Sequence, residues 1–226
     1  MKRQAWIFLF AFALIANITG GFLKDHLIDY VSKPLIVLSL IGYFLSKTNK
    51  ATSSLRKWIV LALAFSCAGD VLLMFQQKDP LFFLLGLSSF LIAHLFYIVF
   101  FHRVRAREKI KGNTWVLLFV AIYYVALIIF LSPYLGDMKL PVRIYGVVIS
   151  FMLMLALHML FIKNKGAGKC MVVGAVLFIM SDSILAINKF YHPFEMAVLA
   201  IMLTYGMAQV FIVEGAGSYI TSDYKE

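Results

Sequence analysis

Long apolar blocks follow one another along almost the entire chain, and they constrain its fold more than any other feature. Each block holds roughly 15–22 residues, enough for a helix rising about 1.5 Å per residue to cross a hydrocarbon core of about 30 Å. The connections are short, so the sequence predicts one all-α transmembrane domain, residues 1–226, built as a polytopic membrane helix bundle. The expected spans are 5–23, 33–47, 56–76, 81–101, 114–132, 141–162, 169–188 and 194–214.

Composition agrees with a membrane location. The chain is 62% hydrophobic and 14% charged, whereas roughly half of the residues in a soluble protein are apolar. A transmembrane barrel would show short segments of alternating polarity, and these are absent. The first block, in "MKRQAWIFLFAFALIANITGG", is interpreted as a helix because it lacks the A-x-A cleavage signal of a secretory leader.

Positive charge predicts the orientation. The net charge of +10 raises nucleic acid as a partner, but the basic residues lie in short loops between apolar blocks and form no basic domain. With a cytoplasmic N-terminus, 15 of the 21 Lys and Arg residues fall inside and six outside, as the positive-inside rule requires. The sequence therefore predicts cytoplasmic termini, a location in the bacterial inner membrane, and no nucleic-acid partner.

The two halves of the chain resemble each other weakly. "AGDVLLM" at 68–74 aligns with "MSDSILA" at 180–186, which places Asp70 and Asp182 112 residues apart in the third and seventh spans. Because each half contains an even number of spans, both would have the same orientation. The sequence thus favours two parallel half-repeats, 1–110 and 111–226.

Several polar residues are expected at one depth in the bundle. Asp70 and Asp182 each come about 14 residues after the start of a span, by the spacing of the helix. His94 and Tyr205 fall at a similar level in two spans that run the other way. An ionised side chain in lipid costs about 3 kcal/mol on insertion scales and usually faces the bundle interior. The aspartates are therefore the strongest candidates for a functional site.

The residue types favour acid/base chemistry. A metal site needs three or more ligands at one level, and among the histidines only His94 lies near the aspartates, so no metal is expected. Cys67 and Cys170 are isolated and form no redox or thiolate motif. Of two neighbouring buried carboxyls, one can hold a proton near neutral pH while the other is ionised. Such a pair supplies an acid and a base for hydrolysis of an acid-labile ether.

Five short motifs in this chain resemble the YhhN family of eight-span membrane proteins. They are "KP" at 33–34, "AGD" ending at Asp70, "AHLFY" at 93–97, "SDSILAINKF" at 181–190 and "YGMAQ" at 205–209. The resemblance implies hydrolysis of the vinyl-ether bond of a lysoplasmalogen, a lysophospholipid of the bilayer. The products would be a fatty aldehyde and a glycerophospho-ethanolamine or -choline.

Vinyl-ether hydrolysis needs a proton donor, a carboxylate and a channel for the alkyl chain, with no metal or organic cofactor. We expect Asp70 and Asp182 to form the acid/base pair. Lys33 and Lys189 are expected to meet the lipid phosphate near the outer rim. The residues expected to orient water and substrate oxygens are His94, Tyr97, Tyr145, Ser181, Tyr205 and Gln209.

Three other functions fit the same pattern. The scaffold could hydrolyse other lysolipids, including acyl forms. Intramembrane Asp, His and Tyr also form proton relays in transporters, although the prolines are expected at span ends and not within interrupted helices. Finally, the aspartates could pair with lysines in a purely structural role, Lys189 being a partner for Asp182.

Overall fold

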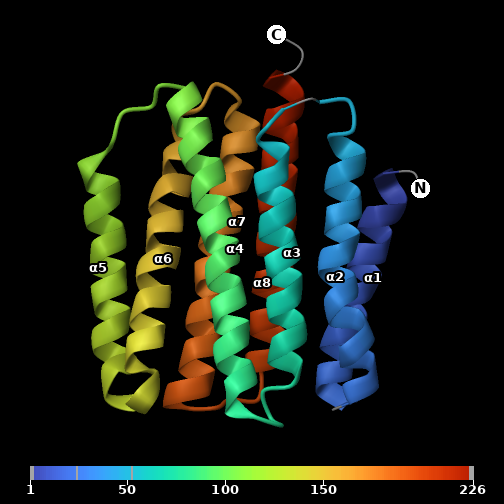
Figure 1. The fold of residues 1–226 in the computed structure, drawn as a ribbon, viewed down its shortest axis with the longest axis vertical. Coiled ribbons are helices and arrows are strands. Elements are labelled where there is room, and N and C mark those ends of the chain that lie inside the picture. Colours follow the sequence, from blue (N-terminus) through green and yellow to red (C-terminus); the bar gives the residue numbers. More distant parts are fainter. Residues whose placement is uncertain (1–2, 24, 52, 224–226) are drawn as a thin grey trace.

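The protein is described by a computed structural model that covers residues 3–23, 25–51 and 53–223. Eight long helices run side by side in a single bundle (Figure 1), and the described residues contain no strand. The helices are α1 Arg3–Leu23, α2 His26–Lys47, α3 Arg56–Met74, α4 Pro80–Arg107, α5 Thr114–Leu131, α6 Lys139–Leu157, α7 Lys165–Ala186 and α8 Ala197–Asp223. Four short turns join or extend them: η1 Ser132–Tyr134, η2 Gly136–Met138, η3 His158–Phe161 and the π-helical η4 Ile187–Tyr191.

The eight predicted spans are confirmed as membrane-length helices, but some of their ends differ. Helix α2 begins at His26 and not at residue 33. The Asp25 carboxylate caps this helix, since Oδ1 accepts bonds from the backbone N–H of Leu27 at 2.9 Å and Ile28 at 3.3 Å. Pro34 therefore lies inside α2, and the expectation that every proline marks a span end is wrong at this position.

Neighbouring helices in the chain pair as antiparallel hairpins, of which α7–α8, α3–α4 and α1–α2 are the most extensive. Helix α8 also packs against α1, α2 and α3, so it joins the N-terminal hairpins to α7. Helix α5 lies at one edge of the bundle (Figure 1), and only Val120 and Leu131 of this helix are buried. The core of the molecule is therefore built around α8, and α5 is peripheral.

Glycine permits the close approach of α7 and α8. A Cβ added at Gly174 would lie 2.7 Å from the backbone nitrogen of Ile212 and 2.8 Å from the carbonyl oxygen of Ala208, both on α8. At Gly215 it would lie 2.7 Å from the carbonyl oxygen of Ala167 on α7. In lipid there is no hydrophobic driving force between helices, so their association depends on close packing. Small residues at the interface allow the two backbones to pack closely.

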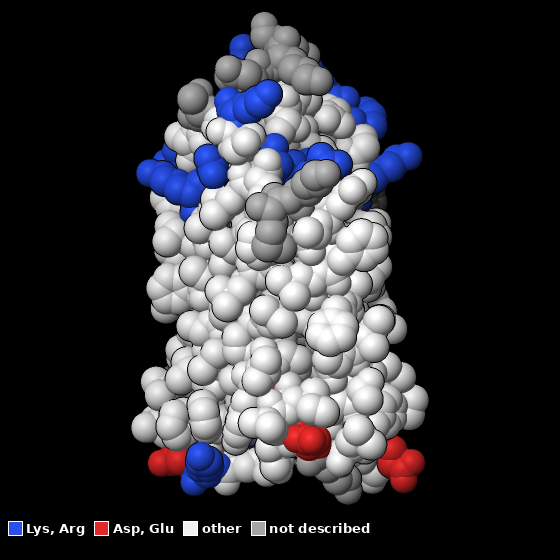
Figure 2. Space-filling view, turned by 90° about the vertical axis from the view of Figure 1, so that its right-hand side faces the viewer, with Lys and Arg blue, Asp and Glu red and all other residues white. Residues whose placement is uncertain are grey.

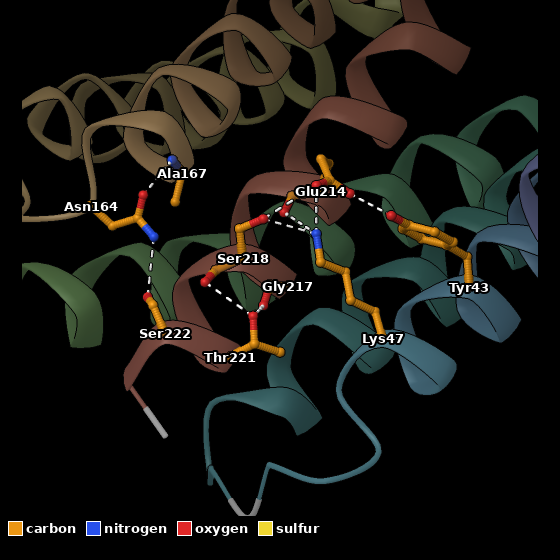
Figure 3. Close-up of polar contacts among 9 residues, drawn as sticks. All are labelled: Tyr43, Lys47, Asn164, Ala167, Glu214, Gly217, Ser218, Thr221 and Ser222. Carbon is orange, nitrogen blue, oxygen red and sulfur yellow. Dashed lines mark hydrogen bonds and ion pairs between the residues drawn. The ribbon is translucent and has the colours of Figure 1, made fainter. Parts of the chain in front are cut away.

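An ion pair ties α2 to α8 near one end of the bundle (Figure 3). Lys47 Nζ lies 2.5 Å from Glu214 Oε1 and donates to Ser218 Oγ at 2.8 Å. The Tyr43 hydroxyl donates to Glu214 Oε2 at 2.5 Å. The lysine side chain is only 8% exposed, so this cluster compensates each charge within the protein. It was not predicted from the sequence.

Charge is distributed unevenly between the two ends (Figure 2). Lysine and arginine side chains form a belt near the end that holds the α2–α3 and α4–α5 connections. On the face shown, acidic side chains lie at the opposite end together with a basic one, and a wide uncharged band separates the two ends. The uncharged band matches the hydrocarbon region, as expected for an integral, multi-pass membrane protein.

Replacing Gly174 with alanine should destabilise the protein by about 1–3 kcal/mol, because the added methyl group meets fixed backbone atoms of α8. Thermal unfolding in detergent measures the change. Gly166→Ala in the same helix is the control, since its Cβ would have no neighbour nearer than 3.7 Å. Equal stability of the two variants would contradict the close packing described for α7 and α8.

Replacing Lys47 with methionine should cost about 1–3 kcal/mol, because Glu214 loses its ion-pair partner. The double variant Lys47→Met/Glu214→Leu should recover part of this loss, since neither charge then remains. The exposed Lys50 provides the control substitution, Lys50→Met. Chemical unfolding gives the free energy of unfolding of the wild type and the three variants. A Lys47→Met variant as stable as Lys50→Met would refute the role of the pair.

Candidate active site

A cavity of about 230 Å³ opens within the half of the bundle that holds the α3–α4 and α7–α8 connections. Much of its wall is apolar and comes from α3, α4, α6, α7 and α8. The polar residues on the wall are Lys33, Asp70, Gln76, Tyr145, Ser181, Asp182, Asn188 and Tyr205. Six of the ten residues singled out from the sequence thus line one cavity, namely Lys33, Asp70, Tyr145, Ser181, Asp182 and Tyr205.

Asp70 projects from the last turns of α3 and is 7% exposed. Its Oδ2 accepts a hydrogen bond of 2.7 Å from the Tyr205 hydroxyl on α8. The Tyr205 ring packs edge-on against Phe90 at 5.9 Å between centroids. A side chain at Gly69 would lie 2.6 Å from the Phe90 ring, so the glycine of "AGD" allows α4 to approach beside the carboxyl group.

Asp182 lies on α7, and its side chain is 16% exposed. The Tyr145 hydroxyl on α6 donates to Asp182 Oδ2 at 2.5 Å. His94 Nε2 lies 3.9 Å from the same oxygen, which is beyond the length of a direct hydrogen bond. Each aspartate therefore has one tyrosine donor from a neighbouring helix, and Asp182 has the imidazole close by.

His94 is fully buried behind the cavity wall. Its ring packs edge-on against Phe178 at 4.7 Å and Tyr145 at 5.3 Å between centroids. The backbone of Phe90, one turn earlier in α4, is its hydrogen-bonding neighbour. A buried imidazole 3.9 Å from a carboxylate oxygen remains a candidate for a functional role.

Tyr97 and Gln209 form a second buried layer, one turn below His94 and Tyr205. The Tyr97 hydroxyl donates to Gln209 Oε1 at 2.6 Å, and both side chains are fully buried. Neither residue lines the cavity, and neither does His94. The structure therefore places these three behind the wall, where they pack against the residues that face the cavity.

One lysine lines the cavity and a second contacts residues of its wall. Lys33 lines the cavity. Lys189 lies at the rim, where Nζ donates to Gln76 Oε1 at 3.1 Å and sits 4.7 Å from the centroid of the Phe83 ring. Lys189 thus contacts Gln76, and no ion pair joins it to Asp182 among the described residues.

Other residues have roles that the sequence did not reveal. The Ser181 hydroxyl donates to the carbonyl of Ile201 at 3.0 Å and holds α7 to α8. Phe178 contacts His94, Tyr97 and Tyr205 at once, but a phenylalanine in an apolar run carries no signal of such a position. Gln76 and Asn188 at the rim follow the ends of their helices, where a polar residue is expected in any case.

Within the described residues, no three His, Cys, Asp or Glu side chains form a group that could hold a metal.

The fold and the site define an integral membrane protein with two aspartates on the wall of one intramembrane cavity. This chain belongs to the YhhN family, whose sequence profile matches residues 28–216. It is 33% identical over 188 residues to the human protein named lysoplasmalogenase TMEM86B, covering 81% of this chain and 73% of that protein.

Two further relatives come from a bacterium and from human. A protein of Mycobacterium tuberculosis named lysoplasmalogenase is 31% identical over 163 residues, which cover 71% of this chain. The matched region spans only 60% of that mycobacterial relative. The human lysoplasmalogenase TMEM86A is 29% identical over 163 residues, or 70% of this chain and 64% of that protein. No solved structure matches the chain.

The hydrogen bond between Tyr97 and Gln209 should contribute about 0.5–2 kcal/mol to stability, the range found for polar contacts between membrane helices. A double-mutant cycle with Tyr97→Phe and Gln209→Leu measures it by thermal unfolding. The combined variant should lose less stability than the sum of the single changes. Tyr134→Phe, at a ring 47% exposed, is the control, and strictly additive losses in the cycle would argue against the contact.

Proposed function

We propose that this protein is a membrane hydrolase that cleaves the vinyl-ether bond of lysoplasmalogens, with Asp70 and Asp182 as the acid/base pair. One observation carries the proposal: both carboxyl groups face the same largely apolar cavity, and each accepts a hydrogen bond from a tyrosine. The names of the similar mycobacterial and human proteins support the same reaction. Because the chain matches 60% of the mycobacterial relative, its activity is a proposal and does not follow from the likeness alone.

The reaction requires one protonated and one ionised carboxyl group. The protonated carboxyl transfers its proton to the vinyl carbon farther from the ether oxygen, giving an oxocarbenium ion. The ionised carboxyl stabilises this cation and then accepts a proton from the water that attacks the carbon next to the oxygen. The resulting hemiacetal collapses to a fatty aldehyde and the free hydroxyl group of the glycerol. Two carboxyl groups on one cavity favour this divided protonation, because two negative charges in the same low-dielectric space repel each other.

The surrounding residues position the pair. Tyr145 and Tyr205 hold one oxygen of each carboxyl group, which leaves the second oxygen free to face substrate. His94, beside Asp182, would orient water, and Tyr97 with Gln209 would support this layer from behind. Such preorganised donors lower the cost of charge development in the transition state.

The polar rim suits the phosphate of a lysophospholipid. Lys33 on the wall and Lys189 at the mouth supply two positive charges. A phosphate group bound by these lysines would place the glycerol in the cavity, whose wall carries Asp70 and Asp182. Substrate contact by Ser181 would have to involve its lone pairs, since its proton is donated to α8.

We further propose that the basic end of the molecule faces the cytoplasm of a bacterial cell, with both termini on that side of the inner membrane. The belt of lysine and arginine in Figure 2 supports this orientation through the positive-inside rule. The cavity lies in the opposite half of the bundle, near the α3–α4 and α7–α8 connections. Substrate would then enter from the outer leaflet.

Asp70→Asn and Asp182→Asn should each lower vinyl-ether hydrolysis by about 10²–10⁴-fold, because each removes one of two proton-transfer groups. Release of fatty aldehyde by the purified, folded protein measures the rate. Asp137→Asn, at an exposed residue outside the cavity, should keep the wild-type rate. Near-wild-type activity of both cavity variants would rule out this mechanism.

A substrate panel separates the proposed reaction from its alternatives. Matched vinyl-ether, alkyl-ether and acyl lysolipids are compared with the wild-type protein, and only the vinyl ether should be cleaved, since only it is activated by protonation of carbon. Cleavage of the acyl form as well would indicate a general lysolipid hydrolase. Substrate-dependent proton flux in liposomes without aldehyde release would instead favour a transporter. If the aspartate variants lost stability and nothing else, a structural role would be favoured.

A further inference from the structure

A groove adjoins the cavity at Asp182, on the side of α5. This α5 groove, formed between α5, α6 and α7, has a volume of only about 40 Å³. Its apolar lining consists of Leu127, Ile128, Leu131, Val142, Ile149 and Ile179. Val142, Tyr145, Asp182 and Ala186 line both the groove and the cavity. Asp182 and its tyrosine partner therefore stand where the two spaces meet.

The two spaces differ in polarity. The cavity ends in a rim with Lys33, Gln76 and Asn188. Among the described residues, Asp182 is the only charged one that lines the α5 groove. The hydroxyls of Tyr123 and Tyr124 are engaged by Ser183 and by the carbonyl of Arg143. A ligand that occupies both spaces would need a polar part, an apolar part and a junction beside Asp182.

The groove opens towards lipid because α5 is peripheral. Leu127 and Ile128 are partly exposed, and Ile129 on the adjacent face is 69% exposed. In the bilayer these side chains meet hydrocarbon, so a chain lying in the groove can continue between lipid tails without crossing a polar surface. The hydroxyl contact between Tyr123 and Ser183 joins α5 to the residue next to Asp182, which fixes this wall of the groove near the carboxyl group.

We infer that the α5 groove binds the first carbons of the hydrocarbon chain of a lysophospholipid and directs the remainder into the bilayer. This inference rests on the proposed function, since the same lipid would place its headgroup in the cavity. A volume of about 230 Å³ lies below the roughly 300–1,000 Å³ of pockets that enclose a whole drug-sized ligand, so a long-chain lysophospholipid with its headgroup in the cavity must extend beyond it. A vinyl ether joins the glycerol to the chain, and this arrangement puts that bond beside Asp182.

Filling the groove tests the inference. Ile128→Trp should lower kcat/KM for a long-chain lysoplasmalogen by about tenfold or more, because the indole occupies the space of the first chain carbons. Hydrolysis of a short-chain vinyl ether that ends within the cavity should stay close to the wild-type rate. Ile129→Trp, one residue away on the lipid-facing side and outside the groove, should leave both substrates unaffected. Equal losses in the two variants, or equal losses for both chain lengths, would overturn the inference.

A binding measurement separates the groove from the catalytic proposal. An alkyl-ether lysophospholipid with a photoreactive diazirine on its first chain carbons is not cleaved, and it should label residues of α5 and α6 that line the groove in the wild-type protein. Ile128→Trp should reduce this labelling, and Ile129→Trp should not. Groove labelling without any vinyl-ether hydrolysis would uphold the chain site and refute the proposed function. Labelling confined to other helices, or equal labelling by a diacyl phospholipid with the same diazirine, would refute the chain site.

Discussion

Carboxyl groups in the hydrocarbon region need hydrogen-bond donors from the protein, because the surrounding lipid offers none. This requirement links the helices that carry the site. Tyr205 on α8 reaches Asp70 on α3, and Tyr145 on α6 reaches Asp182 on α7. Each bond joins helices from different hairpins, so the site and the tertiary arrangement depend on the same contacts. The close approach of α7 and α8 at Gly174 then fixes how Asp182 stands relative to Tyr205.

Span number and depth could be predicted from the sequence because the thickness of the bilayer acts on every helix alike. Counting residues from a span end therefore placed Asp70, Asp182 and Tyr205 at one level, and the structure brings all three to one cavity. The sequence did not predict how each helix is rotated about its own axis, and this rotation decides which side chains face the cavity. Nothing in the sequence distinguished Tyr97 and His94, which lie behind the wall, from residues that face the cavity.

Side-chain contacts between helices distant in the sequence also could not be predicted. Lys47 is the last residue of the second expected span, and nothing in the sequence linked it to Glu214 of α8, with which it pairs. Lys189 contacts Gln76 instead of Asp182. The start of α2 was missed because the polar residues before Pro34 suggested a loop, although the Asp25 cap begins the helix earlier. The two half-repeats stay a prediction. In their favour, Tyr97 and Gln209 contact each other and have the same separation of 112 residues as Asp70 and Asp182.

The half of the bundle nearest the basic belt is tightly packed, and this has a consequence for the movement of protons. Tyr97, Phe100 and Phe101 are completely buried along the half of α4 nearest the α4–α5 connection, and Phe178 packs against Tyr97 from α7. Aspartates near the middle of a membrane often form part of a conduction path for protons. Here the fully buried Ile212 and Val213 of α8 lie between Gln209 and the Lys47–Glu214 pair. These apolar side chains carry no proton, so protonation of the aspartates would be exchanged through the cavity, from one side of the membrane. Under the proposed function, turnover would then leave the membrane potential undisturbed.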